Sequence, residues 1–410
     1  MELSFSRCSL RCVIATSLLL LTLPAFSQIA KGDRLLSNGA VPSTGSLEPL
    51  ATAGYNFSSV DSDFNVFAGA IAADYLQYAT GSLALGGGLY YNHASVPALD
   101  YGFTQIDASI RLRYGWNVTG KIHVYSQISP SYQLEITKFT NSTRSGQTGI
   151  FRIIEKTAQI TPSLGTLVRL NQHAFADFSV GFSLLVSKSV GGSATEASFW
   201  SDTAEELYTQ TSNALRVNVS PIARFGAGGA DSASTSLATA GIAKGSWLVG
   251  GSGASLTIRG VGSSVRTPKA NDIVINASAY KFVNRRLAVG GELTFQRTWD
   301  GQFSPASIIN VRPAVRYYLA PAKLSTLMLG AGVAVSSDDD FASRSSSVGV
   351  QLDALYVLKL RPGVFGEFGP ALSINRTFNN IFSSSIETGT YVGFIAGLQF
   401  ALAGRSKLDQ

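Results

Sequence analysis

Apolar and polar residues alternate along this chain with a period of two, and the alternation limits the possible folds more than any other feature. Between residues 105 and 116, for example, Ile106 and Ile110 alternate with Asp107 and Arg111. Strands of soluble proteins average about five or six residues, whereas a tilted strand needs about nine to eleven to cross a bilayer. The pattern predicts an all-β fold, an antiparallel transmembrane β-barrel.

The composition supports this fold class. Charged residues make up 14% of the 410 residues, against about 25% in soluble domains. After residue 27 no apolar run approaches the roughly 18 residues of a membrane helix. In a membrane barrel one face of each strand contacts lipid, so a low charge content is expected. A secreted β-sandwich also fits the composition, but the long strands disfavour it.

The first 27 residues have the features of a secretory signal peptide. Arg7 and Arg11 are basic, residues 13–23 are apolar, and residues 25–27 (AFS) form a small-x-small cleavage site. We expect residues 1–27 to be removed before Gln28. Both cysteines of the chain lie in this segment, so we expect no disulfide in the mature protein.

The mature sequence opens twice in a similar way. Residues 29–36 read IAKGDRLL and residues 242–249 read IAKGSWLV. The sequence predicts a first β-barrel repeat at 28–225, a Gly/Ala/Ser linker at 226–241 and a second β-barrel repeat at 242–410. Each repeat holds about eight strand-like segments, which gives about sixteen strands in all.

The connections between these segments alternate between short and long. Residues 283–286 and 319–323 are tight turns, whereas 190–204, 337–345 and 378–387 are long and polar. Outer-membrane barrels have short periplasmic turns and long extracellular loops. We therefore place both termini and the linker on the periplasmic side. Aromatic residues near strand ends are expected to form girdles at the headgroups: Tyr114, Trp116, Trp299, Tyr317 and Tyr318.

Three motifs carry a resemblance to a known family. They are the Lys-Gly-x-x-Leu opening, the strand–turn–strand unit YKFVNRRLAVGG at 280–291, and the proline motif VRPAVRYY at 311–318. The apolar-x-Pro step recurs at 128–130, 160–162, 219–221 and 368–370, where we expect β-bulges. Each half resembles the OmpX/OmpA-like small bacterial outer-membrane β-barrel domain, here present as two tandem repeats. The doubling leaves two architectures open, two tandem eight-stranded barrels or one sixteen-stranded barrel. The linker of about 16 residues is long for a periplasmic turn, which favours two barrels.

The inward face of the predicted strands carries charges of both signs. Because an eight-stranded barrel is just wide enough for its own side chains, we interpret these residues as a paired polar plug, with a pore lining and a ligand or catalytic site as alternatives. The predicted network comprises Asp107, Arg111, Arg113, His123, Glu135, Glu155, Asp177, Arg216, Arg224, Glu292, Arg312, Arg316 and Glu367.

No catalytic, cofactor-binding or metal site is predicted. None of the three histidines, His93, His123 and His173, lies near a G-x-S-x-G or H-E-x-x-H motif. Residues 338–340 (DDD) lack the glycine and distal glutamate of a calcium loop. We therefore expect a protein that is not an enzyme and has no cofactor.

The sequence predicts that the protein is located in the outer membrane and that its partner there is the lipid of the bilayer. The formal net charge of +6 is scattered without a basic run, so no nucleic-acid partner is expected. Two tandem barrels would have a structural or surface-interaction role through their long extracellular loops. One large barrel would be a general diffusion porin, with a weak anion preference from Arg111, Arg113, Arg312 and Arg316. A barrel-embedded hydrolase or acyltransferase is a third alternative. The sequence does not name the extracellular partner or solute.

Overall fold

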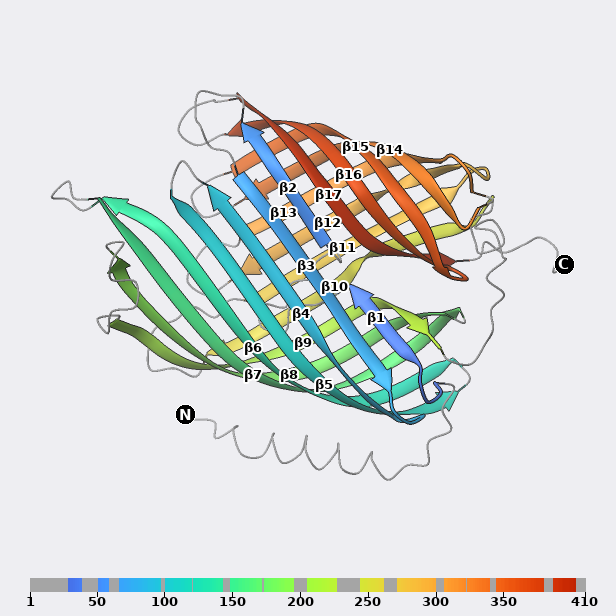
Figure 1. Cartoon of the computed structure of the whole chain (residues 1–410), viewed down its shortest axis with the longest axis horizontal. Helices are drawn as coiled ribbons and strands as arrows, with labels where there is room; N and C mark the ends of the chain where they lie inside the picture. The colour runs from blue at the N-terminus through green and yellow to red at the C-terminus, as the bar shows by residue number, and fades with distance from the viewer. Residues whose placement is uncertain are drawn as a thin grey trace.

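The protein is an all-β antiparallel barrel, as the alternation predicts (Figure 1). The computed structural model describes residues 29–38, 51–58, 66–96, 100–119, 121–142, 148–171, 173–194, 205–226, 244–261, 271–299, 306–321, 323–339, 344–379 and 386–402. The predicted signal peptide (1–27) and all but the first residue of the predicted linker (226–241) lie outside these residues. Within them no helix is long and apolar enough to cross a membrane.

The described residues form seventeen strands. The strands up to the predicted linker are β1 (Arg34–Asn38), β2 (Ala51–Ser58), β3 (Val66–Tyr78), β4 (Leu83–Val96), β5 (Tyr101–Thr119), β6 (Ile122–Ser142), β7 (Thr148–Asn171), β8 (Ala174–Ala194) and β9 (Glu205–Phe225). After the predicted linker come β10 (Trp247–Val261), β11 (Asn271–Phe282), β12 (Leu287–Trp299), β13 (Ala306–Tyr318), β14 (Ser325–Asp339), β15 (Arg344–Arg361), β16 (Val364–Asn379) and β17 (Ile386–Leu402).

The alternation of the sequence becomes an alternation between the inside and the outside of the barrel. On β5, Asp107 and Arg113 are 1% and 2% exposed, whereas Ile110 is 62% exposed. On β14, the apolar residues Leu327 and Val333 are likewise among the exposed ones. The outer surface is therefore apolar, and the polar side chains of these strands point inward.

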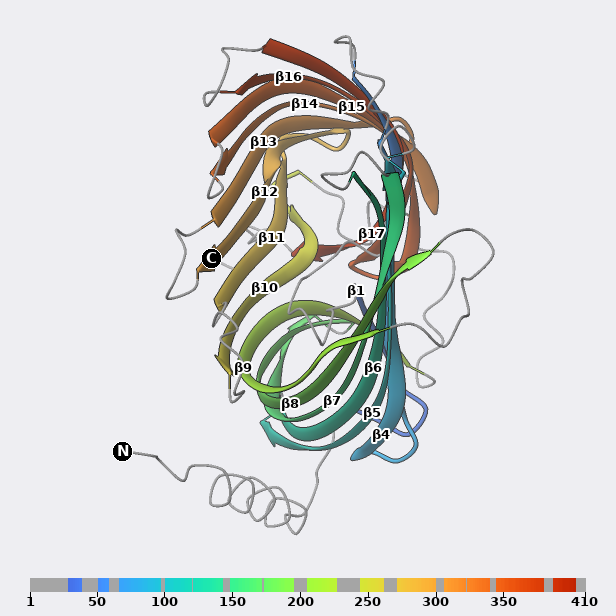
Figure 2. The same cartoon turned by 90° about the vertical axis from the view of Figure 1, so that its left-hand side faces the viewer.

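At the end with the long connections, the strands form one wide ring of sixteen, β2 to β17. Two seams join the halves in this ring. β9 pairs with β10 from Val219↔Ala254 to Ser212↔Val261, and β17 pairs with β2 from Gly389↔Ser58 to Ala396↔Ala51. The two views show the second half above the first, with β2 and β3 reaching across (Figures 1 and 2).

At the end with the short turns, the strands form two separate rings of eight, in which β1 takes part and β2 does not. β1 pairs with both β3 and β9 and closes the first ring, which consists of β1 and β3–β9. β10 pairs with β17 and closes the second ring, β10–β17. Neither predicted alternative describes this arrangement alone, and the prediction of about sixteen strands misses β1 as a separate seventeenth. In the second half one strand, β10, lies first beside β17 of its own half and then beside β9 of the other half, whereas in the first half two strands share these roles: β1 pairs with β9, and β2 pairs with β17.

The strands change partners at positions where a proline or a glycine interrupts the ladder of backbone hydrogen bonds. β9 leaves β10 after Val219 and meets β1 from Ile222, with Pro221, which has no N–H, between them. β10 has a register shift between Gly250 and Gly253, and the φ angle of Gly253 is +107°. A Cβ on Gly253 would lie 1.9 Å from the carbonyl oxygen of Val219. Only glycine fits this crossing without a backbone shift.

Both small rings are filled with apolar side chains. The first ring encloses a cluster of Ile29, Leu35, Leu76, Tyr78, Ala84, Tyr125, Leu167, Phe175 and Ile222. The second ring encloses Leu248, Tyr280, Phe282, Ala288, Ala314, Tyr318, Met328, Leu355, Val357, Phe365 and Ala401. A third cluster, drawn from β8, β9, β16 and β17, contains residues of both halves: Ala174, Ala223, Val364, Leu398 and Phe400.

The prediction of bulges at the prolines is wrong. At Pro130, Pro162, Pro313 and Pro370 the ladder to one neighbouring strand lacks two pairs and then continues in the same register. Proline removes a donor on one side of its strand, and in these strands a local gap accommodates the loss without an inserted residue.

The predicted aromatic girdle is also only partly an outer feature. Tyr317 is exposed on the barrel, but Tyr318 is fully buried and belongs to the cluster in the second ring. Its ring lies 5.2 Å from that of Phe282. Adjacent residues of a strand point to opposite faces, so the two tyrosines cannot both face the same side.

Candidate functional site

In the first ring, Arg113 of β5 is the centre of a buried polar group above the apolar cluster. Its Nη2 lies 3.2 Å from Oδ2 of Asp177 on β8, and its Nε donates to Gln127 at 2.8 Å. The guanidinium lies 3.6 Å from the ring centroid of Tyr125, whose hydroxyl donates to Asp177 at 2.5 Å. The buried charge is thus paired, hydrogen-bonded and stacked.

Other predicted residues of the first half have separate partners. Arg111 pairs with Asp74 at 2.5 Å, and Arg224 pairs with Asp33 at 2.7 Å. The ring of His123 is buried, with Nε2 3.4 Å from the Tyr78 hydroxyl.

The remaining predicted residues of this half lie higher in the barrel, on the side of the wide ring. Arg216 is buried and donates to the side-chain oxygen of Gln159 at 3.4 Å. Asp107 is buried as well. Glu135 and Glu155 lie directly opposite each other on β6 and β7. The structure therefore distributes the first-half residues over several groups along the interior and does not bring them into one site.

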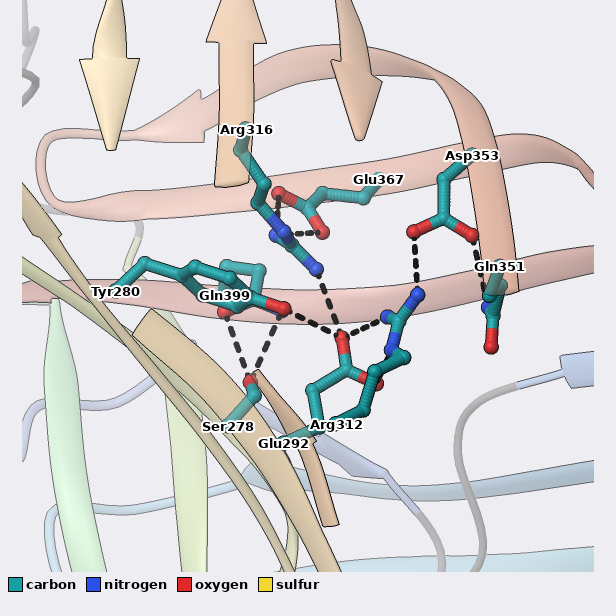
Figure 3. A network of polar contacts seen from close by, with 9 residues as sticks. All are labelled: Ser278, Tyr280, Glu292, Arg312, Arg316, Gln351, Asp353, Glu367 and Gln399. Carbon is teal, nitrogen blue, oxygen red and sulfur yellow. Dashed lines mark hydrogen bonds and ion pairs between the residues drawn. The ribbon is translucent and has the colours of Figure 1, made fainter. Parts of the chain in front are cut away.

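In the second half, the predicted residues do come together. Glu292 of β12 accepts hydrogen bonds from Arg312 and Arg316 of β13 and from the hydroxyl of Tyr280 of β11 (Figure 3). The Nε of Arg312 is 3.1 Å from Glu292, Nη2 of Arg316 is 3.2 Å away, and the tyrosine hydroxyl is 2.8 Å away. Glu292 is therefore the acceptor that links two cations and one hydroxyl.

Each arginine also has a second carboxylate partner. Arg312 Nη1 lies 2.7 Å from Asp353 on β15, and Arg316 Nη1 lies 3.0 and 3.1 Å from the two oxygens of Glu367 on β16. Gln351 donates to the other oxygen of Asp353 at 2.8 Å. Figure 3 shows Arg312 between Glu292 and Asp353, and Arg316 between Glu292 and Glu367. We call these five charged residues the charged cluster.

Part of the charged cluster has a counterpart in the first ring. Arg113 lies opposite Ala84, and Arg316 lies opposite Ala288, each next to a short turn. Their partners, Asp177 and Glu367, stand at matching places on β8 and β16, since each follows a buried phenylalanine by two residues. Each ring therefore has a buried Arg–carboxylate pair at the same place.

The rest of the charged cluster has no charged counterpart. Glu292 and Arg312 face each other across β12 and β13, where the first half has Gly88 opposite Ser109. Asp353 pairs with the residue four positions after Glu367, and the corresponding residue in the first half is Ser163. Three charged side chains thus occupy positions that are glycine or serine in the other half.

A cavity of about 290 Å³ lies next to the charged cluster. The five charged residues line it together with residues of β10, β11, β12, β15 and β17. The other lining residues are Gly251, Asn276, Ser278, Thr294, Gln351, Leu355, Tyr391, Ile395, Ala396, Gly397, Leu398 and Gln399. The cavity is therefore polar on several strands and partly apolar on β17.

Sequence reasoning missed several members of these groups. Asp353, Asp74 and Asp33 are the acidic partners of predicted arginines, and Tyr280 and Tyr125 stack under guanidiniums. The signal for Asp353 was present, because it lies between the outward-facing Leu352 and Ala354 on an alternating strand. The partners' identities depend on strand neighbours far apart in sequence, which the alternation does not reveal.

Within the described part of the chain, no group of three or more His, Cys, Asp or Glu residues is arranged to hold a metal ion. The charged cluster contains three carboxylates, but two arginines separate them.

No protein-family model and no curated protein sequence matches this chain. Among solved structures, CdiB from Acinetobacter baumannii has a TM-score of 0.44 at 10% identity, covering 89% of this chain and 66% of that one. The toluene transporter TbuX from Ralstonia pickettii has a TM-score of 0.33 at 10% identity, covering 94% of each chain. The translocator domain of the autotransporter NalP from Neisseria meningitidis has a TM-score of 0.31 at 8% identity, covering 96% and 94%. With TM-scores this low, none of these likenesses assigns the chain to a family.

Proposed function

We propose that this protein is an integral outer-membrane β-barrel that does not conduct and that acts through its wide end. The apolar outer surface supports a place in lipid. Aliphatic side chains such as Leu85, Ile110 and Val350 are more than half exposed, and other exposed aliphatic and aromatic side chains recur on most strands around the barrel. A soluble monomer seldom exposes contiguous apolar patches of more than a few hundred Å². Strand pairing that closes on itself also suits a bilayer, which offers no partner for a free sheet edge.

The filled small rings are the observation that carries the non-conducting role. Each ring has eight strands, a size at which side chains just fill the interior, and each contains an apolar cluster beneath a buried ion pair. The alternative of an anion-selective porin requires free cations along a pathway. All four arginines proposed for that role are paired with carboxylates.

The wide end is then the part available for interaction. It carries the long connections, and binding residues commonly lie on loops held by a rigid scaffold. We propose a structural or surface-interaction role there, rather than catalysis. The sixteen-stranded ring supplies a wide frame for the connections that follow β8 and β16, which the sequence predicted as long loops.

The matching places of Arg113 and Arg316, together with the repeated IAKG opening, support an origin of the two halves as tandem repeats of an OmpX/OmpA-like unit. In each opening the glycine N–H donates to the last residue of the neighbouring strand, from Gly32 to Tyr78 and from Gly245 to Phe282. Both glycines have φ angles near +90°, which accounts for their presence at the same place in both halves.

Conductance of the full mature chain, refolded and inserted in a planar bilayer, tests the proposal. We expect a silent membrane from protein whose gel mobility is heat-modifiable, which shows that the barrel has folded. Removal of the large plug residues of the second ring, in a Phe282→Ala, Tyr318→Ala, Phe365→Ala variant, is expected to give small channels. Large, steady openings of the unaltered protein would overturn the proposal and favour a porin.

A further inference from the structure

The cavity beside the charged cluster is lined by three charged residues that have no charged residue at the matching position of the first half. The first half has Gly88, Ser109 and Ser163 where the second half has Glu292, Arg312 and Asp353, and its own further ion pairs, Arg111–Asp74 and Arg224–Asp33, use other positions. Burial of charge is costly even when the charges are paired. The extra three charges line an open volume in place of packed side chains, which points to a ligand.

The balance of charge in the lining favours a cation. Three carboxylates and two guanidiniums give the cavity a formal charge of −1. Each arginine already donates to two carboxylates: Arg312 makes three bonds to Glu292 and Asp353, and Arg316 donates to Glu367 and Glu292. A carboxylate has about four lone-pair sites and only accepts. The oxygens of Asp353 receive one bond each, from Gln351 and Arg312, so acceptor capacity remains.

The neutral polar residues of the lining can both donate and accept, so they leave the charge balance unchanged. They are Asn276, Gln351, Gln399, Ser278 and Thr294. Glu292 is the most accessible member of the charged cluster, with 32% of its side chain exposed. A ligand that donates hydrogen bonds can therefore reach Glu292 without breaking the ion pairs beneath it.

The apolar residues of β17 in the lining indicate that the ligand also has a hydrocarbon part. Tyr391 and Ile395, four residues apart on the same face of the strand, present an aromatic ring and aliphatic carbon. Small-molecule sites combine such apolar walls with a few convergent polar groups, in volumes from about 300 Å³ upward. The volume of about 290 Å³ is at the lower end of that range.

We propose that this cavity binds a small organic cation, an ammonium or guanidinium group on a short hydrocarbon chain. The cationic group donates to Glu292 and to the free lone pairs of Asp353, and the hydrocarbon chain lies against Tyr391 and Ile395. The proposal does not depend on whether the small rings conduct, because the cavity lies above the apolar cluster of the second ring.

Three probes of the same shape and different charge test the proposal: butylammonium, 1-butanol and butyrate. Each is titrated into the refolded full mature chain in non-ionic detergent, and binding is followed by ligand-observed NMR, with protein-free micelles as blank. We expect butylammonium to bind at least tenfold more tightly than 1-butanol, and butyrate not to bind. Equal binding of butylammonium and 1-butanol would show a merely apolar cavity and overturn the proposal, as would preference for butyrate or no binding of any probe.

Two variants and a matched control locate the site. Asp353→Asn removes a carboxylate of the lining, and Ile395→Trp fills the cavity without altering the charged cluster. Both are expected to weaken butylammonium binding at least tenfold while gel mobility remains heat-modifiable. Asp177→Asn makes the same change in the buried pair of the first ring, outside the cavity, and should leave binding unchanged. Equal binding by the Ile395→Trp variant would place the cation elsewhere and refute the assignment, even if Asp353→Asn failed to fold.

Discussion

At the scale of single residues, the interior of this barrel is organised by arginines that are stacked and paired. Arg113 lies over the ring of Tyr125, and Arg316 lies 3.9 Å from the ring centroid of Tyr280. A planar guanidinium can stack on a ring and still donate to a carboxylate in its own plane. Lysine could not replace arginine here, because a single ammonium has neither the planar face nor the fork of donors.

Replacing Arg316 tests how much the second ring depends on such a pair. Arg316→Gln leaves the buried Glu367 without a cation, and removal of one partner of a buried pair costs about 3–5 kcal/mol. We expect the free energy of unfolding in lipid vesicles, measured with urea and tryptophan fluorescence, to fall by about that amount. Arg285→Gln, in an exposed turn, is the control and should change it by less than about 0.5 kcal/mol. A loss as small as the control's would show that water reaches Glu367. The double variant Arg316→Met, Glu367→Leu should recover most of the loss.

At the scale of strands, β10 is the element that connects the two kinds of ring. Its first residues pair with β17 and its last residues with β9. The strand must turn from one partner to the other within the few residues around Gly251 and Gly253, both of which have positive φ angles. A bulge with glycine at positive φ is a general means of bending a strand sharply.

Substitution of Gly253 should therefore weaken the seam between β9 and β10. In Gly253→Ala the new methyl group meets the backbone oxygen of Val219, and the φ angle becomes unfavourable. We expect a loss of about 1–3 kcal/mol or more, measured as a lower temperature at which the folded gel band disappears. Gly397→Ala on β17 is the matched control, because a Cβ there meets no atom within 4 Å. An unchanged transition in Gly253→Ala would mean that β10 does not make this crossing.

At the scale of the whole molecule, the wide ring and the small rings coexist in one chain. This arrangement can be tested by disulfides, since the only cysteines, Cys8 and Cys12, precede the predicted cleavage site. Partners in an antiparallel pair have Cα atoms about 4.5–5.5 Å apart, within the range of a disulfide.

We expect Val217→Cys with Leu256→Cys to cross-link across the β9–β10 seam, and Val249→Cys with Phe400→Cys to cross-link inside the second ring. Mass spectrometry of digested protein with all four substitutions should detect both links in one preparation. Val217→Cys with Phe400→Cys joins strands that are not partners and should give none. If only the first link formed, the protein would be a simple sixteen-stranded barrel; if only the second formed, it would be two tandem barrels.

The sequence predicted well what depends on neighbouring residues. The inward direction of Asp107 and Arg316 follows directly from the period of two. The pairing of strands was harder to predict, because β1 pairs with β9 and β17 pairs with β2, and these partners are far apart in the sequence. The repeated openings indicated two similar halves, but the second partner of β10 depends on the backbone geometry at Gly251 and Gly253, which a sequence pattern does not report.

The site was partly predictable for the same reason. Arg312, Arg316, Glu292 and Glu367 were expected to face inward, and the structure places them within hydrogen-bonding distance of one another. The cavity beside them could not be foreseen. Its lining combines residues of β10, β11, β12, β13, β15, β16 and β17, and the period of two does not show which residues of these strands meet across the interior.

The double pairing of β17 has a consequence for how such a chain is assembled. Its final residues close the second ring against β10, and its earlier residues close the wide ring against β2. Until this last strand arrives, β10 and β2 both present bare backbone edges, one from each half. Neither the second ring nor the wide ring is closed until β17 has paired along both parts of its length, so this one strand completes the two closures together.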